Sequence, residues 1–180
     1  MKRLLIFPIL CALISVPLLA QNVSEQQMIQ TMSSAAAEIR TIQCSFRQTR
    51  HVKMLKEEQV SLGRMFCRQP DKLLWEYTSP RKETISTEGE AWKGAMARMI
   101  MKLVAGKALT DSRAFQVTAM EMPTEYVATL VPQRKDLKRI YTQLVLHFDV
   151  RQATVTQVEM YEKSGDRTVI ELYDIRVNED

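Results

Sequence analysis

Hydrophobic and polar residues alternate in the segment Gln69–Pro80, which reads QPDKLLWEYTSP and has a proline near each end. Leu73, Trp75 and Tyr77 fall on one face, and the residues between them fall on the other, which is the pattern of a strand with unlike faces. Proline cannot donate to a sheet ladder, so we expect the two prolines to end this strand. The large side chains on the first face either fill an ordinary core or line a site for a large apolar guest.

The same alternation predicts further strands, and a helical period predicts two helices. Helical spacing begins at Ser24, which with Gln27 resembles a capping box, and runs to about Arg40; it returns over 95–109. The expected remaining strands cover 42–46, 64–68, 84–87, 115–121, 126–131, 140–149, 154–162 and 168–177. This order predicts an α+β fold, mainly β, in which helices cover one face of an antiparallel sheet.

The first twenty residues predict a secretory signal peptide. Lys2 and Arg3 precede an apolar run that ends at Leu19, and Ala20 offers a small residue for cleavage. The run is short for a membrane span, contains two prolines, and is followed by no second hydrophobic segment. We therefore expect an exported, soluble protein with a single domain over residues 21–180, because that length suits one hydrophobic core.

Charge argues against one class of partner. The chain has 25 basic and 21 acidic residues, a net charge of +4, which falls to +2 without the two basic residues of the expected signal peptide. Such a balance does not favour a nucleic-acid surface. One basic cluster lies in an expected strand connection and predicts either a solvated turn or a docking patch for acidic partners or lipid headgroups. Its members are Arg134, Lys135, Lys138 and Arg139.

Two cysteines, Cys44 and Cys67, remain in the expected domain, and the midpoint between them falls at Leu55 and Lys56. If a hairpin turns at that midpoint, the two cysteines lie opposite each other on neighbouring strands and point to the same face. A cross-strand disulfide is one interpretation in an oxidising compartment. Two small buried apolar residues are the other.

Residues typical of catalysis or metal binding are scarce. The only histidines, His51 and His147, have no further histidine or cysteine at metal-ligand spacing, so we expect solvent-facing or satisfied strand histidines. The five glycines are scattered singly, and they build neither a phosphate-binding loop nor a nucleophile elbow. The sequence thus favours binding over catalysis, with no metal and no cofactor.

Several short motifs follow one another along the chain: Ser45-Phe46-x-Gln48, Gly63, Pro70-x4-Trp75-x4-Pro80, the turn Glu88-Gly89, Trp92, and Leu130-Val131-Pro132 before the strand through Phe148-Asp149. Taken in this order, they resemble the LolA family of periplasmic outer-membrane lipoprotein carriers. The resemblance covers nearly the whole expected domain. It implies an incomplete antiparallel barrel whose open side is covered by helices, with an apolar interior that accepts acyl chains.

The resemblance also implies an acyl-chain site on the inner faces of the strands and on the second helix. The residues expected there are Cys44, Phe46, Met65, Cys67, Leu73, Trp75, Tyr77, Met96, Met99, Ile100 and Leu103. Methionines suit a wall that repacks around variable chains, although a methionine stripe also fits a plain core. Where the family usually has an arginine that ties down the helical lid, this chain has Gln69, which is the expected lid contact.

The function implied is lipoprotein transport by a monomeric, cofactor-free periplasmic chaperone. It would take acylated lipoproteins from an inner-membrane exporter and deliver them to an outer-membrane acceptor. The alternative is an envelope regulatory or sensor module of the same fold that detects mislocalised lipid or lipoprotein. Because the chain passes almost directly from Trp92 to a helix near Ala95, one or two family strands are expected to be missing. The family's C-terminal extension has no counterpart after Asn178, which leaves the direction of transfer open.

Overall fold

The structure is a computed structural model that describes residues 23–55, 57–87 and 99–179. Its strands are β1 (Thr41–His51), β2 (Gln59–Arg68), β3 (Lys72–Ser79), β4 (Glu83–Ser86), β5 (Phe115–Glu121), β6 (Glu125–Pro132), β7 (Tyr141–Asp149), β8 (Thr154–Glu162) and β9 (Arg167–Val177). Its helices are α1 (Glu25–Glu38), the 3-10 helix η1 (Lys107–Thr110), α3 (Lys135–Ile140) and a helical segment over 99–104. None of the helices in these ranges is long and apolar enough to cross a bilayer.

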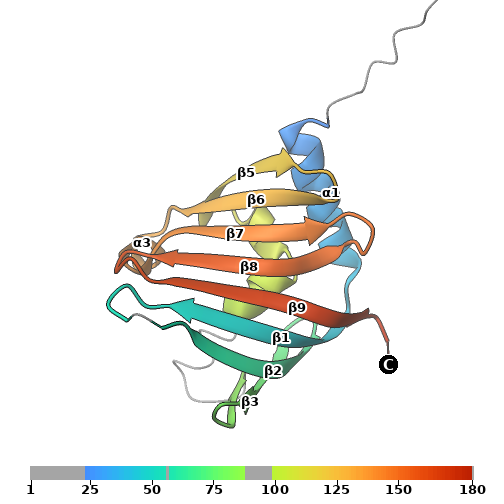
Figure 1. Ribbon diagram of the computed structural model, residues 1–180. Coiled ribbons are helices and arrows are strands. Elements are labelled where there is room, and N and C mark those ends of the chain that lie inside the picture. Colours follow the sequence, from blue (N-terminus) through green and yellow to red (C-terminus); the bar gives the residue numbers. More distant parts are fainter. Residues whose placement is uncertain (1–22, 56, 88–98, 180) are drawn as a thin grey trace, which may run out of the picture.

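The nine strands of the described residues belong to one antiparallel sheet in the order β4-β3-β2-β1-β9-β8-β7-β6-β5. Figure 1 shows the part of it from β3 to β5. Among the described strands the sheet is not closed into a barrel, because β4 and β5 form its two edges. The side chains of one face form a single core cluster with α1, the 99–104 segment and η1. This architecture confirms the expected fold class, a mainly β α+β fold with an incomplete barrel and helices on the open side.

The first helix begins where the capping box predicts. The Ser24 side chain accepts a hydrogen bond from the Gln27 amide at 3.2 Å, and the Gln27 side chain accepts one from the Ser24 amide at 2.9 Å. These two bonds satisfy backbone donors that a helix leaves without partners at its start. The helix buries Met28, Met32 and Ala36 and packs against β5 and η1.

An asparagine near the end of the described chain holds the other end of α1. The Asn178 Oδ1 accepts hydrogen bonds from the Arg40 amide at 2.7 Å and the Thr41 amide at 3.3 Å, and its Nδ2 donates to the Glu38 carbonyl at 3.0 Å. One side chain thus satisfies the backbone at the end of α1 and the start of β1. It also joins this corner to the residue that follows β9.

The hairpin of β1 and β2 forms as expected, but its register is shifted. Cys44 pairs with Met65, and Cys67 pairs with Ile42. The prediction that the cysteines lie directly opposite each other is therefore wrong, since the turn is centred one residue earlier than the midpoint between them. A shift of two residues keeps a side chain on the same face, so both cysteines still point inward and are buried.

The strand between the two prolines carries an aromatic cluster. Trp75 stacks on Phe46 with ring centroids 4.0 Å apart, and Tyr77 meets Phe46 edge-on at 5.4 Å. Phe46 lies opposite Gly63 on the neighbouring strand. A side chain at Gly63 would clash with the Phe46 ring and the Glu76 carbonyl, so glycine leaves the space that the ring occupies.

Two further predictions have definite outcomes. The expected strands at 115–121 and 154–162 have the same bounds as β5 and β8. The basic cluster between β6 and β7 is not a simple turn, because residues 135–140 form α3 with Leu137 buried beneath it. The expected signal peptide, Met96, the turn at Glu88-Gly89, Trp92 and the connection where strands were expected to be missing lie outside the described residues.

Candidate functional site

A cavity of about 710 Å³ lies at the end of the sheet where α3 connects β6 to β7. We call this end of the molecule the cavity end; it is on the left in Figure 1. The lining comes from β1, β3, β7, β8 and β9, from the 99–104 segment and from α3. Its residues are Gln48, Arg50, Tyr77, Met99, Ile100, Lys102, Arg134, Asp136, Leu137, Ile140, Tyr141, Met160, Glu162, Thr168 and Ile170.

Strand alternation explains which residues reach the cavity. On β9, Ile170 is buried on the inner face, while its neighbour Glu171 is exposed on the outer face. On β8, Met160 faces the cavity between two residues of the outer face. The 99–104 segment, which packs on the inner face of the sheet, adds Met99 and Ile100 to the lining. Apolar side chains from several separate elements thus meet around one space.

Polar groups at the cavity are paired with one another. Arg50 Nη2 lies 3.4 Å from Asp166 Oδ2 and 3.9 Å from Glu162 Oε1. The Tyr77 hydroxyl donates a hydrogen bond to Gln48 at 3.0 Å. Burial raises the pKa of Tyr77, so its hydroxyl stays neutral and keeps its proton at physiological pH. The Arg50 charge and the Tyr77 hydroxyl thus have partners at the cavity, although within the described residues Arg50 Nε is buried without a hydrogen-bond partner.

The predicted acyl-chain residues divide into two groups. Tyr77, Met99 and Ile100 line the cavity, and Ile100 is also a buried member of the core at 7% exposure. The other described ones are buried in the core behind it: Cys44, Phe46, Met65, Cys67, Leu73, Trp75 and Leu103. Their contact with an acyl chain stays a prediction. Sequence reasoning missed the lining from β8, β9 and α3, because only the fold brings these distant segments beside Tyr77.

Gln69, the expected lid contact, touches a different helix from the one over the cavity. Its side-chain Nε2 donates to the Ala36 carbonyl at 3.4 Å, and its amide donates to the Arg40 carbonyl at 2.8 Å. Both bonds fix the end of α1 against the start of the strand that carries Trp75. A role in holding a lid over the cavity remains a prediction.

The two cysteines are free thiols. Burial, and next the neighbouring Cys67, raises the pKa of Cys44 to about 12. Burial raises the pKa of Cys67 to about 11, although Lys107 acts in the opposite direction. Both thiols are protonated at neutral pH, and a thiol without thiolate character is a poor nucleophile. They act here as small apolar residues of the inner face.

These raised pKa values predict a loss of stability at alkaline pH. An unfolded thiol ionises near pH 9.0, whereas the folded thiols keep their protons to about pH 11 and 12. Their stabilising contribution is therefore complete below pH 9 and is lost as the pH rises above it. Between pH 9 and 10, the free energy of unfolding should fall by up to about 1 kcal/mol for each thiol.

Urea denaturation at a series of pH values measures this loss. The control is the double variant Cys44→Ala, Cys67→Ala, which should be less stable at pH 7 but should lose less stability between pH 9 and 10. Equal slopes for the two proteins in that range would show that the thiols are not buried in their protonated form.

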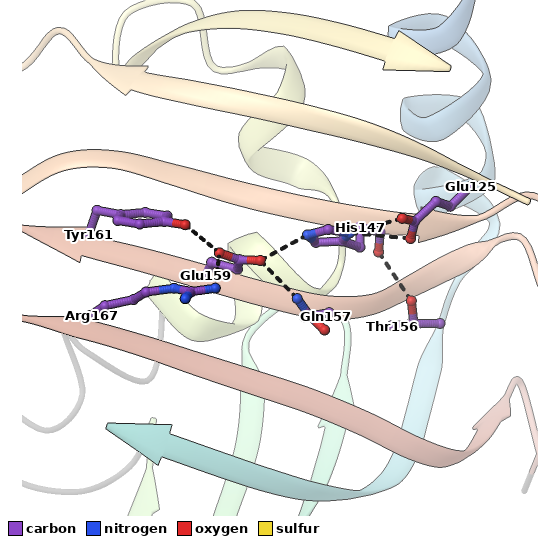
Figure 2. A network of polar contacts seen from close by, with 7 residues as sticks. All are labelled: Glu125, His147, Thr156, Gln157, Glu159, Tyr161 and Arg167. Carbon is purple, nitrogen blue, oxygen red and sulfur yellow. Dashed lines mark hydrogen bonds and ion pairs between the residues drawn. The ribbon is translucent and has the colours of Figure 1, made fainter. Parts of the chain in front are cut away.

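A second cluster of polar side chains lies on the outer face of β6, β7, β8 and β9 (Figure 2). His147 stands between two carboxylates, with Nδ1 3.2 Å from Glu125 and Nε2 3.1 Å from Glu159. Glu159 also accepts hydrogen bonds from Tyr161 at 2.7 Å and Arg167 at 2.8 Å. A shallow hollow of about 360 Å³ borders His147 on this face.

The cluster satisfies a buried carboxylate. Burial by itself would raise the pKa of Glu159, but hydrogen bonds from Tyr161 and Arg167 outweigh it, and the pKa is lowered. Glu159 is therefore ionised at neutral pH and fully partnered. The expectation of a satisfied strand histidine agrees with the contacts of His147. Within the described residues, no group of three or more histidine, cysteine, aspartate or glutamate side chains could hold a metal ion.

Residues 37–93 match the family model described as outer membrane lipoprotein carrier protein LolA. Over these residues the chain is similar to the LolA family. The matched segment runs from the end of α1 past β4 and includes the aromatic cluster and Gly63. The resemblance stated from the motifs is thereby confirmed. No curated protein sequence matches this LolA-like chain.

Solved structures share the arrangement at low sequence identity. MucB is 8% identical with a TM-score of 0.52; the match covers 86% of this chain and 59% of MucB. The MucA/MucB complex of Pseudomonas aeruginosa gives 8% identity and a TM-score of 0.48, covering 84% of this chain and 56% of that chain. A LolA superfamily protein from Nitrosomonas europaea is 12% identical with a TM-score of 0.43, covering 85% and 94%. The MucB likeness supports the LolA-like fold alone.

Proposed function

We propose that this LolA-like protein binds the acyl chains of lipoproteins in the cavity at the cavity end and carries them through the periplasm. The observation that supports the proposal is the cavity itself, which has a volume of about 710 Å³ and whose lining combines apolar and aromatic side chains with charged and polar ones. A cavity whose apolar side chains are accompanied by a small number of polar groups suits a guest that is largely hydrophobic.

The energetics of an acyl chain suit such a site. Burying one methylene is worth about 0.8 kcal/mol, so a dozen methylenes give roughly 10 kcal/mol before the costs of binding. Because this attraction is large, a carrier also needs a wall that can rearrange for release. Met99 and Met160 line the cavity, and methionine is the most adaptable apolar side chain.

The resemblance to the LolA family supports a route between the two membranes. Cargo would be received from an inner-membrane exporter and given to an outer-membrane acceptor, and the carrier would work as a monomer without catalysis or a cofactor. The expected signal peptide would place it in the periplasm. Purification from the periplasm followed by mass spectrometry should detect co-purifying lipoprotein or phospholipid. A protein that is always empty and also fails to bind acylated peptide would refute the carrier proposal.

Filling the cavity should shorten the acyl chains that the protein accepts. Met99→Trp places a larger ring at the cavity wall, so affinity for peptides with long acyl chains should fall by about tenfold or more, which corresponds to the loss of two buried methylenes. Short acyl chains should bind almost as before. Titration of one peptide sequence with acyl chains of increasing length measures the effect.

Met120→Trp is the matched control, because Met120 is 58% exposed on β5, far from the cavity lining. Met120→Trp should leave the affinity for every acyl-chain length unchanged. If Met99→Trp and Met120→Trp give the same chain-length dependence, acyl chains do not occupy this cavity.

A second candidate function is an envelope sensor that detects mislocalised lipid or lipoprotein. The likeness to MucB favours it, since MucB has been solved in complex with MucA. A sensor should have a stable protein partner, and its deletion should change transcription before lipoprotein placement changes. The opposite order of events would exclude the sensor and favour the carrier.

A further inference from the structure

The connection between β1 and β2 exposes hydrophobic side chains at the cavity end. Met54 is 92% exposed and Leu55 is 52% exposed. Val60 and Leu62, on the adjoining part of β2, are 39% and 40% exposed. We call Met54 and Leu55 the apolar tip. Two adjacent apolar residues exposed at a turn, with two further exposed apolar residues on β2 beyond Glu57 and Glu58, favour contact with an apolar phase.

The apolar tip is held in place by hydrogen bonds. The Lys53 amide donates to Asp166 Oδ1 at 3.1 Å, which joins this connection to the turn between β8 and β9. The Leu55 amide donates to the Val52 carbonyl at 2.8 Å and closes the turn. Since Arg50 also pairs with Asp166, the tip is fixed to the same groups that border the cavity. These contacts fix the turn in the conformation that leaves the apolar tip exposed.

The strand connections at this end carry more basic than acidic side chains, although Glu57 and Glu58 follow the tip itself. In the described parts of the connections β1–β2, β3–β4, β6–β7 and β8–β9, eight basic side chains occur against four acidic ones. At the opposite end, the only charged side chains in the described connections β2–β3, β5–β6 and β7–β8 are Arg151 and Asp71. The largest group is on and beside α3, where Lys138 and Arg139 are exposed. The positive charge therefore lies at the end where the cavity is found.

We propose that the cavity end docks on an anionic membrane surface, with the apolar tip in the headgroup region and the basic side chains of α3 against lipid phosphates. A short apolar segment or a few basic residues alone bind a bilayer weakly, whereas the two together give measurable affinity. Docked this way, the cavity faces the bilayer. This surface does not depend on what the cavity holds, so the inference stands apart from the proposed cargo.

Sedimentation with vesicles tests the docking. The purified protein should bind vesicles of phosphatidylcholine containing about a third phosphatidylglycerol, and should bind pure phosphatidylcholine much less. Raised salt should weaken the binding, because it screens exposed charges. Met54→Asp should lower the partition coefficient by about tenfold, since it replaces an apolar group at the headgroup region by a charge that anionic lipids repel.

Matched controls lie at the opposite end. Met122 is 45% exposed between β5 and β6, so Met122→Asp makes the same change away from the proposed surface and should keep vesicle binding. Lys138→Glu should weaken binding to anionic vesicles roughly fivefold or more, whereas Lys72→Glu, next to the connection at the opposite end, should not. Every variant shares the same N-terminus, so any binding by residues 1–20 cancels in these comparisons.

The outcomes decide between clear alternatives. Equal binding by Met54→Asp and Met122→Asp, or equal binding to neutral and anionic vesicles, would overturn the proposal. If the unchanged protein does not bind vesicles at all, the docking proposal is also wrong. The apolar tip would then be expected to contact another protein. Met54 is not part of the cavity lining, so acylated-peptide affinity in the absence of vesicles should be unaltered by Met54→Asp. Failure of the docking and failure of the carrier proposal are thereby distinguishable.

Discussion

Trp75→Ala should lower the free energy of unfolding by about 3 to 5 kcal/mol, the range found when large core aromatics are truncated. Trp75 is fully buried at 0% exposure and stacks on Phe46 at 4.0 Å. Its ring is also 6.3 Å from that of Tyr77. Truncation would therefore leave a cavity between two strands and remove two aromatic contacts. Urea denaturation followed by far-UV circular dichroism measures the loss.

Trp75→Phe is the control, because a smaller aromatic ring keeps part of the stacking on Phe46. It should cost clearly less than Trp75→Ala. Trp75 lies behind Tyr77 and is not in the cavity lining, so any loss of acylated-peptide binding should follow from a displaced Tyr77. A Trp75→Ala protein with nearly unchanged stability would contradict its place in the core.

Ile100→Asp should lower acylated-peptide affinity by at least about a hundredfold while costing less stability than Leu103→Asp. Ile100 lines the cavity, where water from the mouth can hydrate a carboxylate in the empty protein, but an acyl chain would have to displace that water. Leu103 is only 1% exposed and belongs to the core rather than to the lining. A charge there has neither water nor a partner and should cost about 3 to 5 kcal/mol.

The two variants form a matched pair, because the same residue is introduced on one helical segment three positions apart. Thermal midpoints of the lipid-free proteins and peptide titrations together separate cavity wall from core. If Ile100→Asp unfolds the lipid-free protein as severely as Leu103→Asp, residues 99–104 act as plain core and the cavity has no adaptable cover.

The alternation of apolar and polar residues predicted most of the strands, because most strands have one buried and one exposed face. The bracketed strand was predicted with its inward residues, since Leu73 and Trp75 are buried and Leu74 is exposed between them. The capping box marked the start of α1 for a similarly local reason. Local signals of this kind depend on neighbouring residues alone.

Features that depend on contacts between distant parts of the chain were harder to predict from the sequence. The register of β1 and β2 depends on where the turn closes, and a one-residue error there moves each pairing by two residues. α3 was missed because it has only six residues and a single buried one, Leu137, which gives no helical period. The position of the cavity could not be predicted from the sequence. Met160 and Ile170 line the same cavity as Tyr77 only because of the order of the strands in the sheet.

The position of β9 sets the order in which the molecule can be completed. β1 to β4 are joined by consecutive hairpins, and so are β5 to β8, but only β9 pairs with both β1 and β8. β9 leaves the ribosome after β1 to β8 and is thus the strand that unites these two halves. Until it arrives, both halves expose apolar inner faces, and long-range pairing of this kind is slow to form. Because Thr168 and Ile170 belong to β9 and line the cavity, a newly made chain completes the wall of this cavity only after β9 has paired with β1 and β8.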